Sequence, residues 1–233
     1  FELDASIMEG KDLSAGAVAG LKHVKHPINA AYAVKTKSPH VMLSGAGAEE
    51  FAKEQGLEMV EDNMYFATPK TMEWIEKLKQ ESKKNGTVGC VVLDKQGNLT
   101  AGTSTGGMFK KRWGRIRDSP VIGAGTYADN NSCAVSCTGH GEYFIRHAVA
   151  FDVCARYKYL KESVEKAADY IIHTELNTNA GNGGLIAVDK LGNIAMPYNS
   201  GGMFRGFLYK EKGRPEIKKG CGIGKKIVVV GEK

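Results

Sequence analysis

Apolar and polar positions along this chain form short runs that are typical of alternating strands and helices. Apolar runs predict strands at 2–8, 41–43, 88–93 and 99–104, and two more within 121–137. Apolar residues at helical spacing, with capping residues, predict helices over 14–21, 29–38, 48–55, 142–157 and 164–176, and one that begins at Thr68-Pro69. Strands followed by helices and again by strands indicate an α+β fold, in which helices stack against antiparallel sheets.

Two features divide the chain internally. The helix that begins at Thr68-Pro69 carries Met72, Trp74, Ile75 and Leu78, and it ends in a polar segment, 81–86, which we interpret as a linker. Beyond it, the pattern Asp-Lys-x-Gly-Asn followed by Gly-Gly-Met-Phe occurs twice with the same spacing, over 94–109 and 189–204. The two copies predict two equivalent strand–turn–strand units.

The composition is that of a folded globular protein. The chain has 233 residues, of which 42% are hydrophobic and 25% charged, and this composition excludes a disordered or collagen-like chain. No apolar stretch is long enough to predict a transmembrane helix, and the first residues do not resemble a signal peptide. No compartment is indicated, so we take the cytoplasm as the default.

The net charge of +6 arises from the segment after residue 86, which contains 21 Lys and Arg residues but only 13 Asp and Glu residues. Such a segment attracts acidic substrates or nucleic acid, although a solvated basic surface explains it more simply. The five cysteines, at 90, 133, 137, 154 and 221, lie mostly in apolar runs and fit buried free thiols. Their spacing, with no accompanying histidine pair, does not predict a metal site.

Four segments are candidates for chemistry. Gly102-Thr103-Ser104-Thr105-Gly106 matches a nucleophile elbow but lacks a helical pattern after it. The run 110–117 is basic with one tryptophan, as in some nucleic-acid sites, although a solvated loop explains it more simply. In a third interpretation, Arg115 and Asp118 hold the carboxylate and the ammonium of an amino acid. Residues 137–142 join a strand to a helix through glycines, where backbone amides stabilise anions.

The fourth candidate is Gly86-Thr87, where the polar linker meets an apolar strand. A threonine at a chain terminus combines a nucleophilic hydroxyl with an α-amine whose pKa, about 8, suits a general base. This chemistry requires cleavage after Gly86.

Five segments, in this order, together resemble the isoaspartyl peptidase/plant-type L-asparaginase family of N-terminal nucleophile hydrolases. They are Thr87-Val88-Gly89, 102–108, Gly114-Arg115-x-x-Asp118-Ser119-Pro120, 123–128 and Ser136-Cys137-Thr138-Gly139-His140-Gly141-Glu142. The resemblance extends more loosely over 1–86 through Ala5-Ser6-Ile7-Met8 and 16–21.

The resemblance implies a role for each catalytic position. The precursor would cleave itself between Gly86 and Thr87, which makes Thr87 the N-terminal nucleophile and its own base. Thr105 would tune that nucleophile through a hydrogen bond. Thr138 and the backbone N–H of Gly139 would form an oxyanion hole.

The same resemblance implies how substrate is held. Arg115 would bind the α-carboxylate, Asp118 the α-ammonium, and Gly107 and Gly141 would line the pocket with backbone atoms. The substrates would be L-asparagine and β-aspartyl dipeptides, hydrolysed through a β-aspartyl ester. The fold would be a four-layer αββα sandwich, one structural domain with 1–86 as α-subunit and 87–233 as β-subunit, assembled as an (αβ)₂ dimer. The resemblance implies no nucleic acid, membrane, metal or cofactor, apart from a structural sodium or potassium ion in some members.

The sequence departs from the family pattern in several ways. The family's opening segment, which carries that ion-binding loop, does not occur before Phe1, and the linker is short, so we expect the chain to begin inside the fold. Arg117 stands where the motif usually has glycine, and it either alters substrate preference or faces solvent. Gly106-Gly107 favours the isoaspartyl branch over glycosylasparaginases. A glycosylasparaginase-like hydrolase and a non-catalytic remnant acting as an interaction module remain the alternatives.

Overall fold

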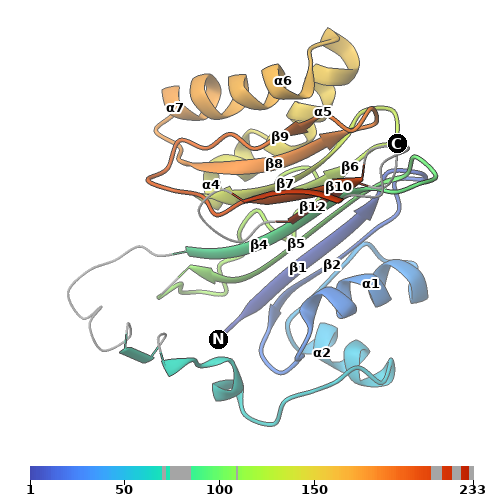
Figure 1. Ribbon diagram of the computed structural model, residues 1–233. Coiled ribbons are helices and arrows are strands. Elements are labelled where there is room, and N and C mark those ends of the chain that lie inside the picture. Colours follow the sequence, from blue (N-terminus) through green and yellow to red (C-terminus); the bar gives the residue numbers. More distant parts are fainter. Residues whose placement is uncertain (70–71, 74–84, 109, 211–216, 222–226, 231–233) are drawn as a thin grey trace.

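Two β-sheets with helices on their outer faces make up the part of the protein that the structure describes (Figure 1). The computed structural model describes residues 1–69, 72–73, 85–108, 110–210, 217–221 and 227–230. The mixture of helices and mainly antiparallel strands confirms the α+β class.

The larger sheet has eight strands in the order β11-β10-β12-β4-β5-β1-β2-β3. Their bounds are β1 Leu3–Glu9, β2 Ala15–Leu21, β3 Met42–Ser44, β4 Asn85–Leu93, β5 Leu99–Met108, β10 Gly206–Lys210, β11 Ile217–Cys221 and β12 Ile227–Val230. Neighbours are antiparallel except for three parallel pairs, β2–β3, β10–β12 and β12–β4. The sheet is therefore mixed, whereas the sequence pattern predicted antiparallel pairing throughout.

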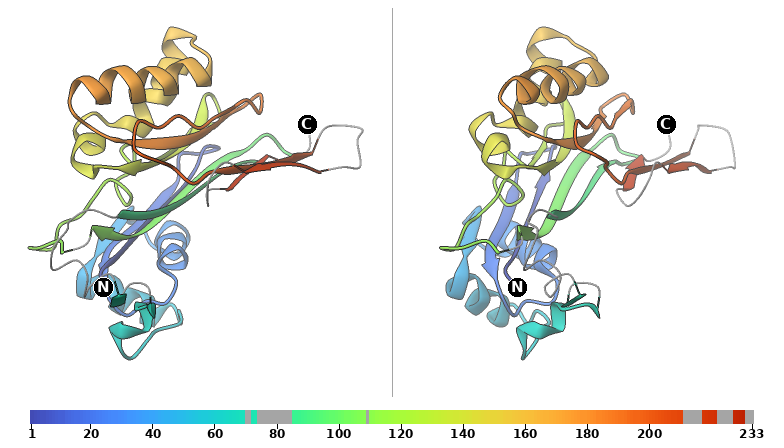
Figure 2. Two further views of the ribbon diagram at one scale, coloured as in Figure 1. Left: turned by 60° about the vertical axis from the view of Figure 1, so that its left-hand side comes forward. Right: turned by 90° about the vertical axis from the view of Figure 1, so that its left-hand side faces the viewer.

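The smaller sheet has the order β6-β7-β8-β9, and all its pairs are antiparallel. Its strands are β6 Thr126–Ala128, β7 Cys133–Gly139, β8 Gly183–Asp189 and β9 Ile194–Ala195. The two views of Figure 2 show this sheet between the larger sheet and a group of helices.

The described helices form two groups on opposite sides of the sheets (Figures 1 and 2). The larger sheet is covered by α1 Pro27–Lys37 and α2 Gly45–Glu54. The smaller sheet is covered by α4 Gly141–Arg146, α5 Val149–Leu160, α6 Val164–Tyr170 and α7 Leu176–Thr178. A π-helical turn, Ile171–Glu175, joins α6 to α7, and a 3₁₀ turn, Asn63–Phe66, follows α2.

Three apolar clusters hold these parts together. One, with Phe144 and Ile171, lies between the second helix group and the smaller sheet, and another, with Val18 and Val34, lies between α1, α2 and the larger sheet. The third fills the space between the two sheets. Strands β7 and β8 supply two clusters each, because side chains alternate between the faces of a strand: Leu185 packs toward the helices and Ile186 toward the other sheet.

The two predicted strand–turn–strand units are present, with nearly identical turns. Asp94 Oδ1 accepts hydrogen bonds from the backbone N–H groups of residues 96 and 98, and Asp189 Oδ1 accepts them from those of 191 and 193. Gly97 and Gly192 adopt φ of +84° and +83°, a left-handed conformation that favours glycine. The first unit joins β4 to β5 in the larger sheet, and the second joins β8 to β9 in the smaller.

The structure corrects two predicted helices. Residues 15–21 form strand β2, because the run is buried on both faces and therefore lacks the alternation that marks an edge or surface strand. The helix predicted over 142–157 is divided into α4 and α5 at Ala148, whose φ is +45°. The side chain of Ser163 caps α6, since its hydroxyl accepts from the N–H of Lys166.

Some predicted features lie outside the described residues. The first turn of the helix at Thr68 is present, with Met72 N–H donating to Thr68 O at 2.9 Å, but Trp74, Ile75, Leu78 and most of the linker are not described. Cys133, Cys137 and Cys154 are buried free thiols and Cys90 is a partly buried one, as predicted, whereas the side chain of Cys221 is not described.

Candidate active site

The predicted nucleophile lies in a row of side chains across the larger sheet. Antiparallel pairing places Thr87 of β4 opposite Thr105 of β5, and Thr105 opposite Asp4 of β1. Directly opposed residues point to the same face of a sheet, so these three side chains share one face. Sequence analysis had not included Asp4 in the site.

Thr105 is the centre of the hydrogen bonds around the predicted cleavage point. Its hydroxyl donates to Gly86 O at 2.7 Å and lies 3.4 Å from Thr87 Oγ1, while Gly107 N–H donates to it at 3.1 Å. Thr105 is buried and Thr87 is half-buried. One hydroxyl therefore contacts both the carbonyl before Thr87 and the hydroxyl of Thr87 itself.

Arg117 joins this row to the other predicted site residues. Its side chain is 1% exposed, so the alternative that it faces solvent is wrong. Nη1 lies 3.4 Å from Thr105 Oγ1, Nε donates to Asp118 Oδ1 at 3.2 Å, and Nη2 donates to Gly139 O at 2.6 Å. A buried guanidinium requires such partners, because an unpaired charge is costly to remove from water.

The glycines at the end of β7 permit close packing at this point. Gly139 has a φ of +156°, and a Cβ there would lie 2.4 Å from Asn182 O. A Cβ on Gly141 would lie 2.8 Å from Asp118 Oδ1 and 2.9 Å from Arg117 Cβ. Thr138 directly precedes Gly139 in β7, and its side chain is half-buried.

Arg115 is held by Glu142, a residue to which sequence analysis assigned no role. Nε and Nη2 of Arg115 donate to the two carboxylate oxygens of Glu142 at 2.6 and 2.8 Å. The remaining nitrogen, Nη1, is buried and has no hydrogen-bond partner among the described residues. Glu142 thus occupies one edge of the guanidinium and leaves Nη1 for another acceptor.

The same pair shifts the acidity of both groups. The hydrogen bonds from Arg115 lower the pKa of Glu142 to about 2. The Glu142 carboxylate in turn raises the pKa of Arg115, and the charges of Asp118 and Asp4 add to that effect. Arg115 therefore lies in a region where carboxylates gather.

Asp4 is a fully buried carboxylate at the other end of the row. Its Oδ1 accepts from Gly20 N–H at 2.8 Å, and its Oδ2 is buried with no hydrogen-bond partner among the described residues. Burial raises the pKa of Asp4, and the charges of Lys111 and Arg117 act in the opposite direction. The sequence signal of the 94–98 turn predicts a hairpin in which Thr87 pairs with Thr105. It gives no signal for Asp4, because the strand of Asp4 lies near the start of the chain and is not part of that hairpin.

The structure therefore brings most of the predicted site residues together. Gly86, Thr87, Thr105 and Gly107 form one cluster, and Arg117 connects it to a second. The second cluster contains Asp118, Gly139 and Gly141, and Arg115 adjoins it through its pair with Glu142.

Two alternative interpretations of the sequence, a nucleophile elbow at 102–106 and a nucleic-acid site at 110–117, do not fit the structure. Ser104 lies within β5, which continues to Met108, so the strand-to-helix turn of a nucleophile elbow is absent there. In the basic run, Trp113 is 95% exposed, whereas Arg115 and Arg117 turn inward to carboxylates. Those two cations do not belong to one exposed basic surface.

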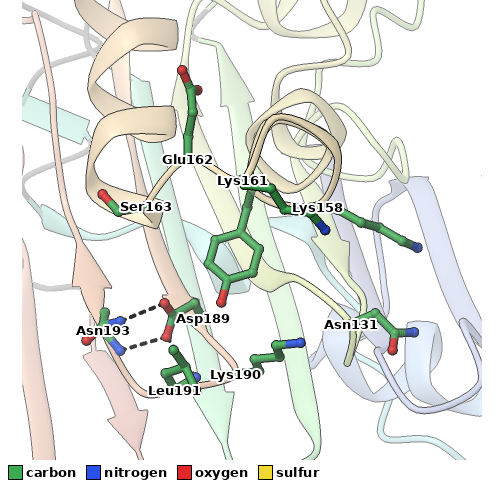
Figure 3. Close-up of a pocket in the computed structure, with 10 residues that line it drawn as sticks. Asn131, Lys158, Lys161, Glu162, Ser163, Asp189, Lys190, Leu191 and Asn193 are labelled. Carbon is green, nitrogen blue, oxygen red and sulfur yellow. Dashed lines mark hydrogen bonds between the residues drawn. The ribbon is translucent and has the colours of Figure 1, made fainter.

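Two cavities lie elsewhere on the described surface. The larger, about 650 Å³, contains none of the predicted site residues. Figure 3 shows Asp189 beside Asn193, whose backbone and side-chain N–H groups donate to the Asp189 carboxylate at 2.8 Å. The smaller, about 390 Å³, is lined by Gly114 and Ile116, on either side of Arg115, and by Gly20.

The described part of the chain contains neither a cluster of metal ligands nor a helix that could span a membrane. No three side chains among its His, Cys, Asp and Glu gather as metal ligands would. None of its helices is long and apolar enough to cross a membrane.

Comparison with known proteins places the chain in a family. A family model described as asparaginase matches residues 1–216. The chain is 48% identical over 222 residues to an isoaspartyl peptidase of Salmonella typhimurium, covering 89% of this chain and 71% of the relative. It is 43% identical to an isoaspartyl peptidase of Escherichia coli, covering 91% and 73%, and 41% identical to the isoaspartyl peptidase/L-asparaginase of Homo sapiens, covering 87% and 68%. The predicted resemblance is thus confirmed: the chain belongs to the isoaspartyl peptidase/L-asparaginase family of hydrolytic enzymes.

Proposed function

We propose that this protein is an autoprocessing amidohydrolase that uses Thr87 as an N-terminal nucleophile. Its substrates are the β-amides of aspartate, namely L-asparagine and β-aspartyl dipeptides, as the names of its relatives suggest. The observation that carries the proposal is the position of the Thr105 hydroxyl, 2.7 Å from Gly86 O and 3.4 Å from Thr87 Oγ1.

Self-cleavage follows from this arrangement. The hydroxyl of Thr87 attacks the carbonyl carbon of Gly86, and the developing negative charge on Gly86 O is stabilised by the Thr105 hydroxyl. The peptide C–N bond breaks, its nitrogen takes a proton and becomes the α-amine of Thr87, and an ester joins Gly86 to Thr87 Oγ1. Water hydrolyses the ester, which releases the carboxylate of Gly86 and regenerates the hydroxyl.

Turnover uses the same hydroxyl with the new amine as its base. The α-amine takes the proton of Thr87 Oγ1, which attacks the side-chain carbonyl of the substrate, while Thr138 and the N–H of Gly139 stabilise the oxyanion. The amide nitrogen leaves as ammonia or as the amine of a peptide, and a β-aspartyl ester remains on Thr87. Water then hydrolyses this ester to aspartate.

Binding of the substrate backbone belongs to Arg115 and Asp118. Glu142 fixes one edge of the Arg115 guanidinium, and the buried Nη1 on its other side is suited to donate to an α-carboxylate. Asp118 is the acceptor for an α-ammonium, and the backbone of Gly107 and Gly141 lines the pocket.

The architecture is consistent with the four-layer αββα sandwich of N-terminal nucleophile hydrolases. Two sheets pack face to face through one apolar cluster, and each carries helices on its outer face through another. We propose that cleavage divides this fold into an α-subunit, 1–86, and a β-subunit, 87–233, which assemble as an (αβ)₂ dimer.

The proposal is tested by the products of self-cleavage. A denaturing gel of the purified protein is expected to show two fragments, and N-terminal sequencing of the larger one to read Thr-Val-Gly-Cys. Thr87→Ala should abolish both cleavage and hydrolysis, whereas Thr87→Ser should retain part of both because it keeps a hydroxyl. One intact band after long incubation of the unmodified protein would instead support a non-catalytic interaction module.

A further inference from the structure

Arg117 lies inside the proposed active site, where its charge must affect what the site binds. It is one of the largest fully buried side chains, at 1% exposure, and its three nitrogens contact three different residues. Two of the groups it contacts, Thr105 and Gly139, belong to the proposed catalytic apparatus. The third, Asp118, is the proposed acceptor for the substrate's α-ammonium.

The guanidinium occupies one oxygen of the carboxylate that is proposed to hold the ammonium. Asp118 Oδ1 accepts from Arg117 Nε at 3.2 Å, and the backbone of Gly141 packs against the same oxygen, where a Cβ would lie at 2.8 Å. A second cation has little space beside this oxygen. The ion pair of Arg117 with Asp118 also cancels the negative charge that would attract an ammonium, and it brings a like charge close to it.

The neighbouring cation strengthens the effect. Arg115, two residues earlier, keeps Nη1 available for an anion. The site therefore combines a carboxylate-binding guanidinium with an acidic group that is already neutralised by Arg117. Such a site suits a substrate that carries an α-carboxylate but no α-ammonium.

We propose, on the basis of the function above, that Arg117 determines specificity and directs the enzyme toward β-amides of dicarboxylates that lack the α-ammonium, the class of succinamate. The position of its guanidinium between Asp118, Thr105 and Gly139 carries this proposal. L-Asparagine remains a substrate but a poorer one.

The experiment compares two substrates that differ only in the ammonium group. Ammonia release from succinamate and from L-asparagine gives kcat/KM for each, in the unmodified protein and in Arg117→Gly and Arg117→Met. The unmodified protein is expected to favour succinamate, and both variants to shift the ratio of the two kcat/KM values toward asparagine by about tenfold or more, as expected when a buried charge pair is removed. Arg117→Met keeps most of the side-chain volume and carries the comparison if Arg117→Gly does not fold.

The matched control is Arg112→Met, because Arg112 is an exposed cation of the same loop. It should leave the substrate ratio unchanged. The inference is overturned if the unmodified protein favours L-asparagine. It is also overturned if Arg117→Met leaves the ratio unchanged, even where both activities fall together as they would from a purely structural role. If neither the unmodified protein nor any variant releases ammonia from either substrate, the proposed function itself is wrong, and the inference fails with it.

Discussion

Thr105→Val is the substitution that most directly tests the geometry of the cleavage point. Valine keeps the branched shape of threonine but removes the hydroxyl that donates to Gly86 O at 2.7 Å. In the proposed attack by Thr87, negative charge develops on that oxygen. Removing one preorganised donor from such an oxyanion costs about 2.7–4 kcal/mol, or about 10²–10³ in rate. Because Thr87 and Gly86 are partly exposed to water, we expect the lower end, a self-cleavage rate reduced about 100-fold.

The assay follows the intact chain and its two fragments on denaturing gels after synthesis, and the rate constant is fitted from band intensities. Thr105→Ser keeps the hydroxyl and should cleave within about tenfold of the unmodified protein, since only a methyl group is lost. The matched control is Thr103→Val, two residues earlier in β5. Thr103 is equally buried, but its hydroxyl bonds Ser136, Thr126 and Gly125 O rather than the cleavage point.

Thr103→Val leaves buried polar groups without a partner, so it should lower the free energy of unfolding by about 1–3 kcal/mol without slowing cleavage. The reasoning is refuted if Thr105→Val cleaves at nearly the rate of the unmodified protein. It is equally refuted if Thr103→Val slows cleavage as much as Thr105→Val does, because the effect would then come from general destabilisation of β5.

The remaining predictions concern groups around the substrate. Arg115→Ala should leave self-cleavage intact but lower kcat/KM at least tenfold for substrates with an α-carboxylate, because losing a charge-assisted contact costs about 2–5 kcal/mol. Arg115→Lys should restore kcat/KM only in part, and an equal loss of self-cleavage in Arg115→Ala would contradict the assignment. Glu142→Gln should lower stability by no more than about 1 kcal/mol, since Glu142 is 58% exposed and water screens the pair. Because the pKa of Glu142 is lowered from 4.5 to about 2, the pair stabilises the fold fully above pH 4.5, and this contribution disappears as the pH falls toward 2. The melting temperatures of Glu142→Gln and of the unmodified protein should therefore differ at neutral pH and converge in acid. Gly141→Ala should lower the melting temperature and both activities, because its Cβ would lie 2.8 Å from Asp118 Oδ1; a fully active variant with unchanged melting temperature would show that this packing is looser than described.

The parts of the site that sequence could predict are those governed by local structure. The turn chemistry of 94–98 defines a hairpin, and pairing continues from Leu93 and Leu99 to Thr87 and Thr105 without an irregularity. Turn residues and alternation are properties of neighbouring positions, so a reader of the sequence sees them directly. The motif resemblance added the roles of these residues, which no periodicity could supply.

The parts that sequence could not predict depend on contacts between distant segments. Arg117 looked like one more cation of a basic loop, and only the approach of β7 and β5 encloses it. The pair of Arg115 with Glu142 likewise joins residues 27 apart. The helix predicted over 14–21 is wrong for a related reason: its small apolar residues fit a helix by local propensity, but the chain buries them as the strand between β1 and β3.

The buried charges around Arg117 connect specificity to stability. Asp4 and Asp118 are both fully buried, and each lies near this one guanidinium. Burial raises the pKa of Asp4, and Arg117 is among the charges that lower it again, so its guanidinium offsets part of the cost of burying a carboxylate in the row with Thr105 and Thr87. Arg117, which is proposed to cancel the charge of Asp118 toward an incoming ammonium, therefore also supports the sheet face that carries the proposed nucleophile. If Arg117 is replaced to test the proposed specificity, we therefore expect a loss of stability as well, located where Thr87 and Thr105 pair in register across β4 and β5.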